Sequence, residues 1–330
     1  FFFFFLFFLL FYCFPTVFNS PNNECKELLD KAADVVLMNG FEDDFVPQGS
    51  AFTGKRKRAR ALMLNVANKL LGTHMDDDTL IIGTSGRYEF KNKGIDVFLE
   101  SLNRLNRDKD LQKNVLAFVN VPGWVGEPRE DLQTRLKSKE KFDTPLEVPF
   151  ITHWLHNMTH DQVLDMLKYL GMGNRPEDKV KVIFVPCYLD GKDGILNKEY
   201  YDLILGEDLS VYPSYYEPWG YTPLESVAFR VPTITTDLAG FGLWVNSLKN
   251  QHGIDNGVEV LHRSDYNYSE VADGIKDTIA LFSGKTDNEV KEIRKQAAAV
   301  AEQALWKHFI KYYYEAYDIA LRNAMKRQLN

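Results

Sequence analysis

The chain has 330 residues, of which 45% are hydrophobic and 13% are aromatic. That is enough apolar material for one large or two ordinary globular domains. The formal net charge of -7 and the pI near 5.6 argue against a general nucleic-acid or anionic-membrane binder, because both partners require a basic protein surface. We therefore expect a small or neutral partner, with no nucleic acid and no membrane.

Residues 1–18, FFFFFLFFLLFYCFPTVF, are strongly apolar. They lack a starting Met, a basic n-region and a small-residue cleavage site, and Pro15 interrupts a stretch that is already short for a bilayer. Three interpretations stay open: a fragment end or out-of-frame artefact, a hydrophobic anchor, or a buried strand. No later stretch has the length and apolarity of a membrane span.

Residues 19–79 form a lead-in to the main domain. The segment ECKELLDKAADVVLMNG predicts a helix that runs into a strand, and GKRKRARALMLNVANKLLG predicts a helix with a basic start. We interpret the basic run as a solvated helix face rather than a nucleic-acid patch, because it is short and lies in an acidic chain.

Residues 80–265 alternate between short apolar runs and amphipathic segments. The runs include TLIIGTSG, NVLAFVNVP, VKVIFVP, LSVYPS, VPTITTD and GVEVLHR. Apolar runs of this length between helical segments are typical of buried parallel strands with crossover helices, so we predict a doubly wound α/β sheet. Ligands then belong at the carboxyl ends of the strands. Residues 266–330 show helical spacing throughout and predict a helical tail packed on the sheet domain.

The segment SYYEPWGYTPLE, residues 214–225, joins a predicted strand to a predicted helix. Thr222, Pro223 and Glu225 fit an N-cap, a first helical position and a capping box, which is a purely structural interpretation. The same junction also presents free backbone N–H groups and the positive end of a helix dipole, which suit a phosphate or pyrophosphate. Glu217 lies just before that helix start, where a carboxylate has no structural purpose unless it meets a ligand or a base.

A second candidate follows the strand TLIIGTSG. Gly83 and Gly86 allow a tight turn there, and Arg87 and Lys93 lie on the loop before the next helix, which we expect to start near Gly94. Neither a G-x-G-x-x-G fingerprint nor a Walker lysine motif is present. Taken alone, Arg87 and Lys93 read as surface charges, but facing the helix start at Thr222 they would neutralise a diphosphate without a metal.

Together these stretches resemble the glycogen synthase family of animals and fungi and its bacterial relatives. The string Y-Y-E-P-W-G-Y-T-P-x-E is highly specific for that family, and the likeness runs from about residue 19 to the C-terminus. The matching segments are NECKELLDKAADVVLMNGFEDDFVP (23–47), GRYEFKNKGIDVFLESLNRLN (86–106), ITHWLHN (151–157), DKVKVIFVPCYL (178–189) and VYPSYYEPWGYTPLESVAFRVPTITTDLAGFG (211–242).

The resemblance implies the Rossmann-like donor half of a two-domain GT-B glycosyltransferase, with residues 80–265 as the nucleotide-sugar-binding domain and residues 19–79 as a remnant of the acceptor half. It implies a retaining glucosyltransferase that moves glucose from UDP-glucose to the non-reducing end of an α-1,4-glucan, needs no cofactor or metal, and is inactive without its acceptor half. Alternatives are a retaining enzyme with another donor, such as ADP-glucose, or another acceptor, and a UDP-sugar-binding module without turnover.

Residue roles follow from the same resemblance. Glu217 would contact the donor glucose and Glu225 the ribose, while Arg87 and Lys93 would hold the phosphates and stabilise the leaving UDP. We rank Glu217, Arg87 and Lys93 as catalytic, because help to the departing diphosphate dominates such a reaction. The remaining predicted donor-binding residues are the helix-start residues and two aromatic side chains that would sandwich uracil or else pack in the core: Gly220, Tyr221, Thr222, Leu224, Tyr188 and Tyr200.

The histidines and the cysteines are two further candidate groups. His153, His156 and His160 suggest a metal site, but no acid or cysteine supports the spacing, so we predict none. The likeness of THWLHN to a family segment leaves open a place for His153 near the donor sugar. Cys13, Cys25 and Cys187 show no paired spacing and read as incidental thiols in a reducing, cytoplasmic compartment. The sequence is compatible with a homo-oligomer and does not fix the oligomeric state.

The sequence departs from the family at a regulatory element. Eukaryotic members carry an arginine-rich helix that binds glucose 6-phosphate, just before a Trp-Lys pair that matches Trp306 and Lys307. Here the segment reads EVKEIRKQAAAVAEQAL, and its only Lys or Arg residues are Lys291, Arg294 and Lys295. Because a phosphate switch needs clustered guanidiniums, we expect no strong activation by glucose 6-phosphate.

Overall fold

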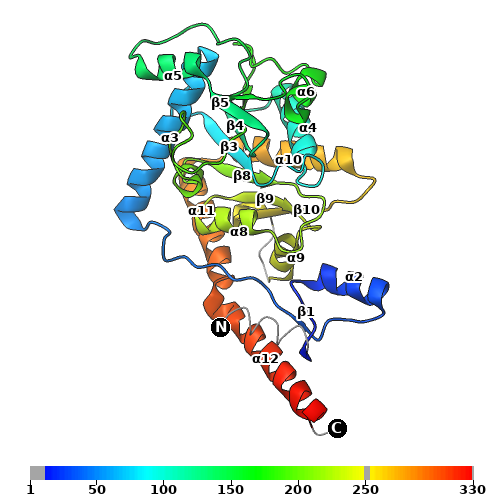
Figure 1. The fold of residues 1–330 in the computed structure, drawn as a ribbon. Helices are drawn as coiled ribbons and strands as arrows, with labels where there is room; N and C mark the ends of the chain where they lie inside the picture. The colour runs from blue at the N-terminus through cyan, green and yellow to red at the C-terminus, as the bar shows by residue number, and fades with distance from the viewer. Residues whose placement is uncertain (1–11, 249–252, 329–330) are drawn as a thin grey trace.

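The computed structural model describes residues 12–248 and 253–328. Its centre is a six-stranded parallel sheet in the order β10-β9-β8-β3-β4-β7 (Figure 1). The strands are β3 (Leu80–Ser85), β4 (Val115–Asn120), β7 (Val180–Val185), β8 (Leu209–Tyr212), β9 (Thr233–Thr236) and β10 (Val258–Leu261). The prediction of a Rossmann-like, doubly wound sheet is confirmed.

The strand order determines where a crevice opens. The chain runs outward from β3 through β4 to β7, and then returns to the other side of β3 to run through β8, β9 and β10. The loops after β3 and β8 therefore leave neighbouring strands in opposite directions, which creates a ligand site at their carboxyl ends. Both faces of the sheet are buried, since the adjacent residues Ile81 and Ile82 are each 0% exposed.

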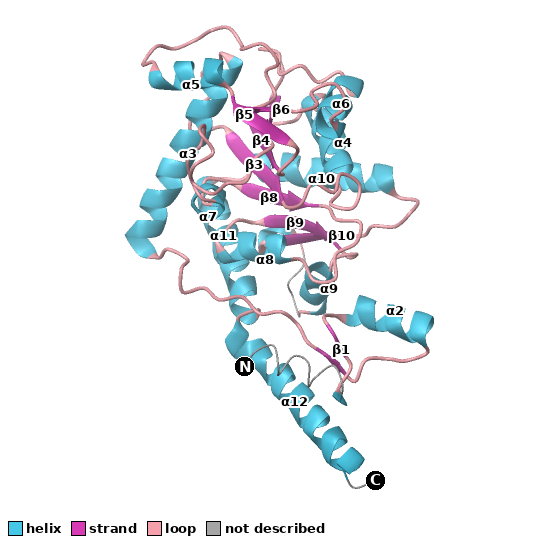
Figure 2. Ribbon diagram, viewed as in Figure 1, coloured by secondary structure: helices cyan, strands magenta, loops and turns pink. Residues whose placement is uncertain are grey.

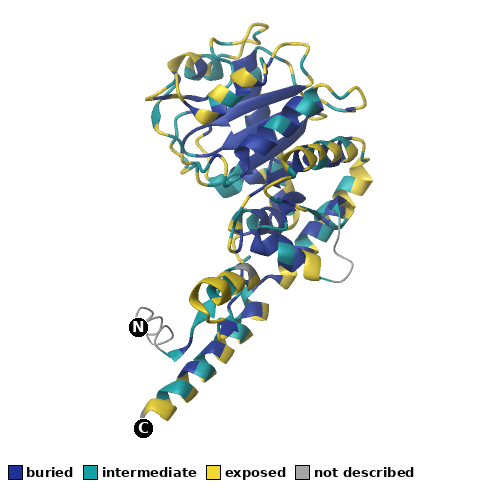
Figure 3. Cartoon of the chain, turned by 90° about the vertical axis from the view of Figure 1, so that its right-hand side faces the viewer, coloured by how far each residue is buried: buried dark blue, intermediate teal, exposed yellow. Residues whose placement is uncertain are grey.

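Helices cover both faces of the sheet (Figure 2), and the sheet is the most buried layer of the protein (Figure 3). One face packs against α4 (Ile95–Asn106), α6 (Gln162–Tyr169) and α10 (Tyr268–Ser283). The opposite face packs against α3 (Gly49–Leu71), α5 (Glu130–Lys137) and α7 (Tyr200–Ile204). A third cluster, beside β10, includes α8 (Tyr221–Ala228), α9 (Gly240–Ser247) and α11 (Asp287–Gln303).

The two ends of the described chain meet below this body. The long helix α12 (Trp306–Gln328) carries the small parallel pair β1 (Pro15–Thr16) and β2 (Val35–Val36), with α2 (Asn19–Leu29) between those strands in sequence (Figure 1). Cys13, Val35 and Leu37 pack there against Ala316 and Ala320. The remaining elements are the 3-10 turn η1 (Ile254–Asn256) and an antiparallel ribbon of β5 (Val125–Pro128) and β6 (His153–Leu155).

Most predicted elements are present, including the helix and strand before residue 49 and the helical tail. Of the apolar segment 1–18, residues 1–11 lie outside the described residues, whereas Phe18 is buried in the core. None of the described helices has the length and apolarity needed to span a bilayer. The cysteines are all free thiols, as expected.

The interpretation of the basic run as a solvated face was wrong for two of its five basic side chains. Lys57 and Arg58 on α3 are exposed, but Arg56 and Arg60 turn inward and pair with Asp208. Sequence spacing alone could not reveal this, because the acid that receives both guanidiniums lies on a distant part of the chain.

Candidate donor-binding site

The loops after β3 and β8 lie directly on each other at the switch point of the sheet. Tyr215 N–H donates to the Asn92 carbonyl at 2.7 Å. Gly94, the N-cap of α4 with φ 68°, faces the Pro213 carbonyl so closely that any side chain at Gly94 would collide with it. Glycine at this position therefore allows the two loops to meet.

Lys93 and Glu217 form an ion pair across this junction, one from each loop. Only 14% of the Lys93 side chain and 19% of the Glu217 side chain are exposed, so water screens the pair weakly. The Glu217 backbone is fixed by the loop after β9, because its N–H donates to the Leu238 carbonyl at 3.2 Å and its carbonyl accepts from Gly240 N–H at 3.0 Å. The carboxylate is thus held beside a cation at the carboxyl edge of the sheet.

Helix α8 begins at this same point. Its N-cap is Gly220, with φ 106° and no side-chain cap, so the predicted capping box of Thr222 and Glu225 is wrong. A left-handed N-cap suits glycine and leaves the first amides, those of Gly220, Tyr221 and Thr222, without partners inside the helix. Leu224 is fully buried and occupies the fourth helical position, where an N–H bonds to the N-cap carbonyl, so Leu224 serves packing.

A cavity of about 400 Å³ adjoins the junction and collects most of the remaining predicted residues. The residues that line it come from five segments: Ser85, Gly86, Arg87, Asn120, Pro122, Cys187, Tyr188, Leu189, Asp190, Tyr200 and Thr222. Arg87 and Thr222 therefore share one cavity. The Lys93 side chain lies against Gly86 on its wall, and the Glu217 side chain lies against Gly220.

The two predicted stacking residues sit differently in this cavity. Tyr188 is 77% exposed, so core packing does not explain it, and its ring is free to stack on a planar ligand. Tyr200 is partly buried, and its hydroxyl lies 2.8 Å from Ser85 Oγ. Arg87 is 75% exposed at its side chain and pairs with Glu89 at 2.8 Å. Because water screens such an exposed pair, it holds Arg87 only weakly.

Sequence reasoning missed the hydroxyl cluster beneath the cavity. Tyr212 OH lies 2.7 Å from Ser226 Oγ and 3.3 Å from Ser85 Oγ, and therefore links β8, α8 and β3. Burial raises the pKa of the Tyr212 hydroxyl to about 12, so it remains a neutral donor and acceptor. These contacts hold α8 against β8 and β3.

The glycogen synthase family model matches residues 10–133 and 132–330 of this chain. The chain belongs to the glycogen synthase family. This confirms the resemblance seen in the Y-Y-E-P-W-G-Y-T-P-x-E string. Among relatives, the glycogen synthase of Neurospora crassa is 26% identical, over 96% of this chain and 53% of that protein. Isoform 2 of Saccharomyces cerevisiae is 28% identical over 96% of this chain and 54% of its own length, and the mouse liver enzyme is 28% identical over 94% and 51%.

The chain thus spans about half the length of the curated relatives it matches. Its fold resembles two solved glycosyltransferases. WaaG, described as involved in lipopolysaccharide biosynthesis, gives a TM-score of 0.53 at 13% identity, over 92% of this chain and 62% of that one. A glycosyltransferase from Rickettsia africae gives 0.51 at 16% identity, over 94% and 63%. At these identities the likeness concerns the fold.

His153 does not lie alone, contrary to the reasoning from spacing. Its ring, Cys187 and Asp193 offer ligand atoms within 4.8 Å of one another. However, His153 Nε2 lies 2.7 Å from the Asp193 carbonyl and Nδ1 lies 2.9 Å from Thr152 Oγ1. The Asp193 carboxylate already accepts three backbone N–H groups, and burial raises the pKa of Cys187 to about 12. These hydrogen bonds stabilise the loop after β7, so we assign the His153 ring and the Asp193 carboxylate a structural role.

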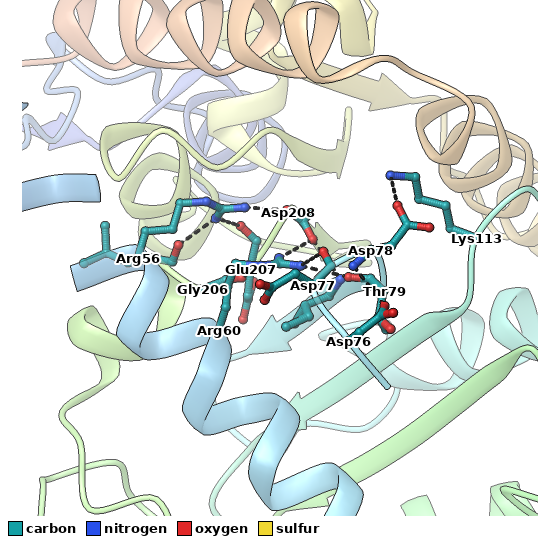
Figure 4. A network of polar contacts seen from close by, with 12 residues as sticks. Arg56, Arg60, Asp76, Asp77, Asp78, Thr79, Lys113, Gly206, Glu207 and Asp208 are labelled. Atoms are coloured by element: carbon teal, nitrogen blue, oxygen red, sulfur yellow. Dashed lines mark hydrogen bonds and ion pairs between the residues drawn. The ribbon is translucent and has the colours of Figure 1, made fainter. Parts of the chain in front are cut away.

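The segment that matches the family's regulatory helix is α11, and its retained arginine points inward. Arg294 donates to the Arg230 carbonyl at 2.9 Å and to the Glu207 carbonyl at 2.7 Å, and lies 3.4 Å from Asp208. A cavity of about 490 Å³ opens beside it, next to the cluster drawn in Figure 4, at the opposite end of the strands from the cavity that Arg87 and Thr222 share (hereafter the candidate donor cavity). The guanidiniums that line this cavity donate to protein acceptors; they belong to Arg56, Arg60, Arg230 and Arg294.

Proposed function

We propose that this chain supplies the donor-binding half of a retaining glucosyltransferase that transfers glucose from UDP-glucose to the non-reducing end of an α-1,4-glucan. The observation that carries the proposal is the meeting of Lys93 and Glu217 beside a cavity shared by Arg87 and Thr222. A sugar nucleotide needs cations at its diphosphate and a carboxylate near its hexose, and this junction offers both. Membership of the glycogen synthase family supports this assignment.

The diphosphate would lie between Arg87, Lys93 and the amides at the start of α8. Guanidinium, ammonium and helix N-terminal amides are the usual partners of phosphate oxygens. The uracil would lie against Tyr188 and Tyr200 on the cavity wall, and Glu225 would accept the ribose hydroxyls. The protein cations supply the charge that a bound metal would otherwise provide, so we propose a reaction without metal or other cofactor.

In the chemical step, the bond between the anomeric carbon and the diphosphate oxygen would break, with its electron pair leaving on UDP, while positive charge develops on the hexose ring. The acceptor hydroxyl oxygen would bond to the anomeric carbon with retention, and its proton would pass to a diphosphate oxygen of the departing UDP. Arg87 and Lys93 would stabilise the departing UDP, and Glu217 would face the oxocarbenium-like carbon. In the structure the Lys93 ammonium is neutralised by Glu217. An incoming diphosphate therefore offers Lys93 a second anion, so Glu217 can turn toward the sugar.

The partners that follow are UDP-glucose and a neutral α-glucan, with no nucleic acid or membrane. We also propose a cytoplasmic location, and the proposal is compatible with a homo-oligomer. The acidic net charge of -7 supports a partner that is not a polyanion.

Calorimetry with UDP on this chain, and a radiolabel transfer assay from UDP-glucose to glycogen with a full-length protein that includes an acceptor half, test the proposal together. We expect micromolar to millimolar UDP binding that is lost in Lys93→Ala, and transfer that is lost in Glu217→Gln. Removing one positioned charge-stabilising group should lower the rate by about 100- to 1,000-fold. Binding without transfer in that full-length protein would favour a UDP-sugar-binding module, and faster turnover of ADP-glucose than of UDP-glucose would change the donor. Absence of UDP binding would contradict the site itself.

A further inference from the structure

Glu225, the second acid of the motif, has a specific partner outside the motif. Its Oε1 accepts a hydrogen bond from Tyr201 OH at 2.8 Å. Within residues 12–248 and 253–328, no other hydrogen-bond donor to this carboxylate is found. Glu225 follows Thr222 by three residues on α8, so both side chains share one face of the helix, and Thr222 lines the candidate donor cavity.

Tyr201 is held rigidly, so its hydroxyl has a fixed position. Its ring stacks on Phe229 with centroids 5.1 Å apart and an interplanar angle of 2°. Phe45 packs against the same ring at 5.1 Å. Phe229 is itself buried in the core. A carboxylate bonded to such a hydroxyl loses the rotamer freedom that an unpaired glutamate side chain would have.

Tyr201 and Tyr200 are neighbours at the start of α7, and they serve different sides of the same site. Tyr200 lines the candidate donor cavity where a base would stack, whereas Tyr201 reaches Glu225. Helix α7 therefore links the position of Tyr200, on which the base would stack, to the position of the Glu225 carboxylate. Because ribose lies between base and diphosphate in any nucleotide, the acid that these two tyrosines flank is placed for ribose.

The hydrogen bond also bears on the chemical form of the acid. Burial raises the pKa of Glu225, and the bond from Tyr201 opposes that rise. An ionised carboxylate accepts hydrogen bonds only, which suits the two hydroxyl donors of a ribose. With Oε1 occupied by Tyr201, Oε2 is left for the ligand.

We propose that Tyr201 is a positioning residue that orients the Glu225 carboxylate toward the ribose hydroxyls and so sets the preference of the site for ribonucleotides. The inference rests on the proposed function, in which Glu225 binds ribose. It assigns to Tyr201 an effect on binding selectivity, with no direct contact to the reacting atoms.

The test compares calorimetric affinities for UDP and for 2′,3′-dideoxy-UDP in the full chain. Because the ribose hydroxyls would donate to a charged group, we expect wild type to prefer UDP by at least about tenfold. In Tyr201→Phe, which keeps the stacked ring, this preference should fall below about threefold, while the affinity for dideoxy-UDP stays within about twofold of wild type. General loss of structure would instead weaken both ligands equally, and that result overturns the inference.

Two variants sharpen the comparison. Glu225→Gln should lose the same preference, and the double variant should lose no more than either single variant, because the residues act through one contact. Tyr216→Phe is the matched control, since Tyr216 OH also bonds a carboxylate, that of Glu24 at 3.0 Å, and its preference should equal that of wild type. A full UDP preference in Tyr201→Phe or in Glu225→Gln overturns the inference while the proposed function stands. Failure of wild type to bind UDP overturns both.

Discussion

Replacing Asp208 by Asn should strongly destabilise the fold. The Asp208 carboxylate lies 2.5 Å from Arg56 and 2.6 Å from Arg60, with Arg294 at 3.4 Å (Figure 4 shows the first two contacts). Its Oδ2 also accepts the N–H of Ile81 on β3 at 2.9 Å. Burial alone would raise the pKa of Asp208, but the three guanidiniums outweigh it and hold that pKa below its ordinary value. The acid is therefore ionised at neutral pH.

The magnitude follows from burial. The side chains of Asp208, Arg56 and Arg294 are only 12%, 19% and 11% exposed, so Asn would leave buried cations without a counter-charge. Removing one partner of a buried ion pair costs about 3–5 kcal/mol. That is a large fraction of the roughly 5–15 kcal/mol by which a domain is stable. The cluster also joins α3 and α11 to the amino ends of the strands that carry the donor site.

Urea unfolding followed by circular dichroism measures the loss as a lower midpoint at constant slope. Asp202→Asn is the matched control, because Asp202 pairs with Lys55 on the same helix α3 but at side-chain exposures of 38% and 45%. That exposed pair should contribute about 0.2–1 kcal/mol. Adding Arg294→Gln to Asp208→Asn should recover part of the loss, since one uncompensated cation is gone. Equal small effects in Asp208→Asn and Asp202→Asn would refute the reasoning.

Three further predictions concern regulation, binding and pH. In the full-length enzyme, glucose 6-phosphate should raise the transfer rate less than about twofold, because Arg294 is engaged with Asp208 and backbone carbonyls, and a large rise would contradict this engagement. Tyr188→Ala should weaken UDP binding about fivefold or more by calorimetry, since stacking of a base on an aromatic ring is worth about 1–3 kcal/mol, whereas unchanged affinity would remove Tyr188 from the site. Burial raises the pKa of Glu207 to about 8, so the folded state holds a proton that the unfolded state releases above its lower ordinary pKa, and stability should fall as pH rises from about 4.5 to about 8. Glu207→Gln should flatten that decline in urea-midpoint measurements at several pH values, and an unaltered slope would exclude Glu207 as its cause.

Most helices and strands of the fold could be predicted from local sequence patterns. Buried strands such as β3, β4 and β7 read as unbroken apolar runs, and the amphipathic spacing of α4 and α6 is equally clear. The ribbon of β5 and β6 was not predicted, because its strands are short and pair antiparallel outside the main sheet. The start of α8 was misplaced, since the left-handed Gly220 begins the helix before Thr222. Glycine conformation at such a junction depends on packing as well as sequence.

For the candidate site, the motif located Glu217, and strand order brought Lys93 to it. Contacts between distant segments could not be read from spacing. Tyr201 meets Glu225 and Cys187 lies beside His153 only because α7 and the loop after β7 fold back onto the sheet. Likewise, the basic run on α3 divides into exposed and buried cations only once Asp208 is in place.

A crystal structure with bound UDP tests the central claim most directly. We predict that the diphosphate lies within hydrogen-bond distance of Arg87, Lys93 and the first amides of α8, with the base against Tyr188 and Lys93 drawn away from Glu217. UDP found in the arginine-lined cavity at the other end of the strands, or a diphosphate contacting neither Lys93 nor the start of α8, would contradict the account.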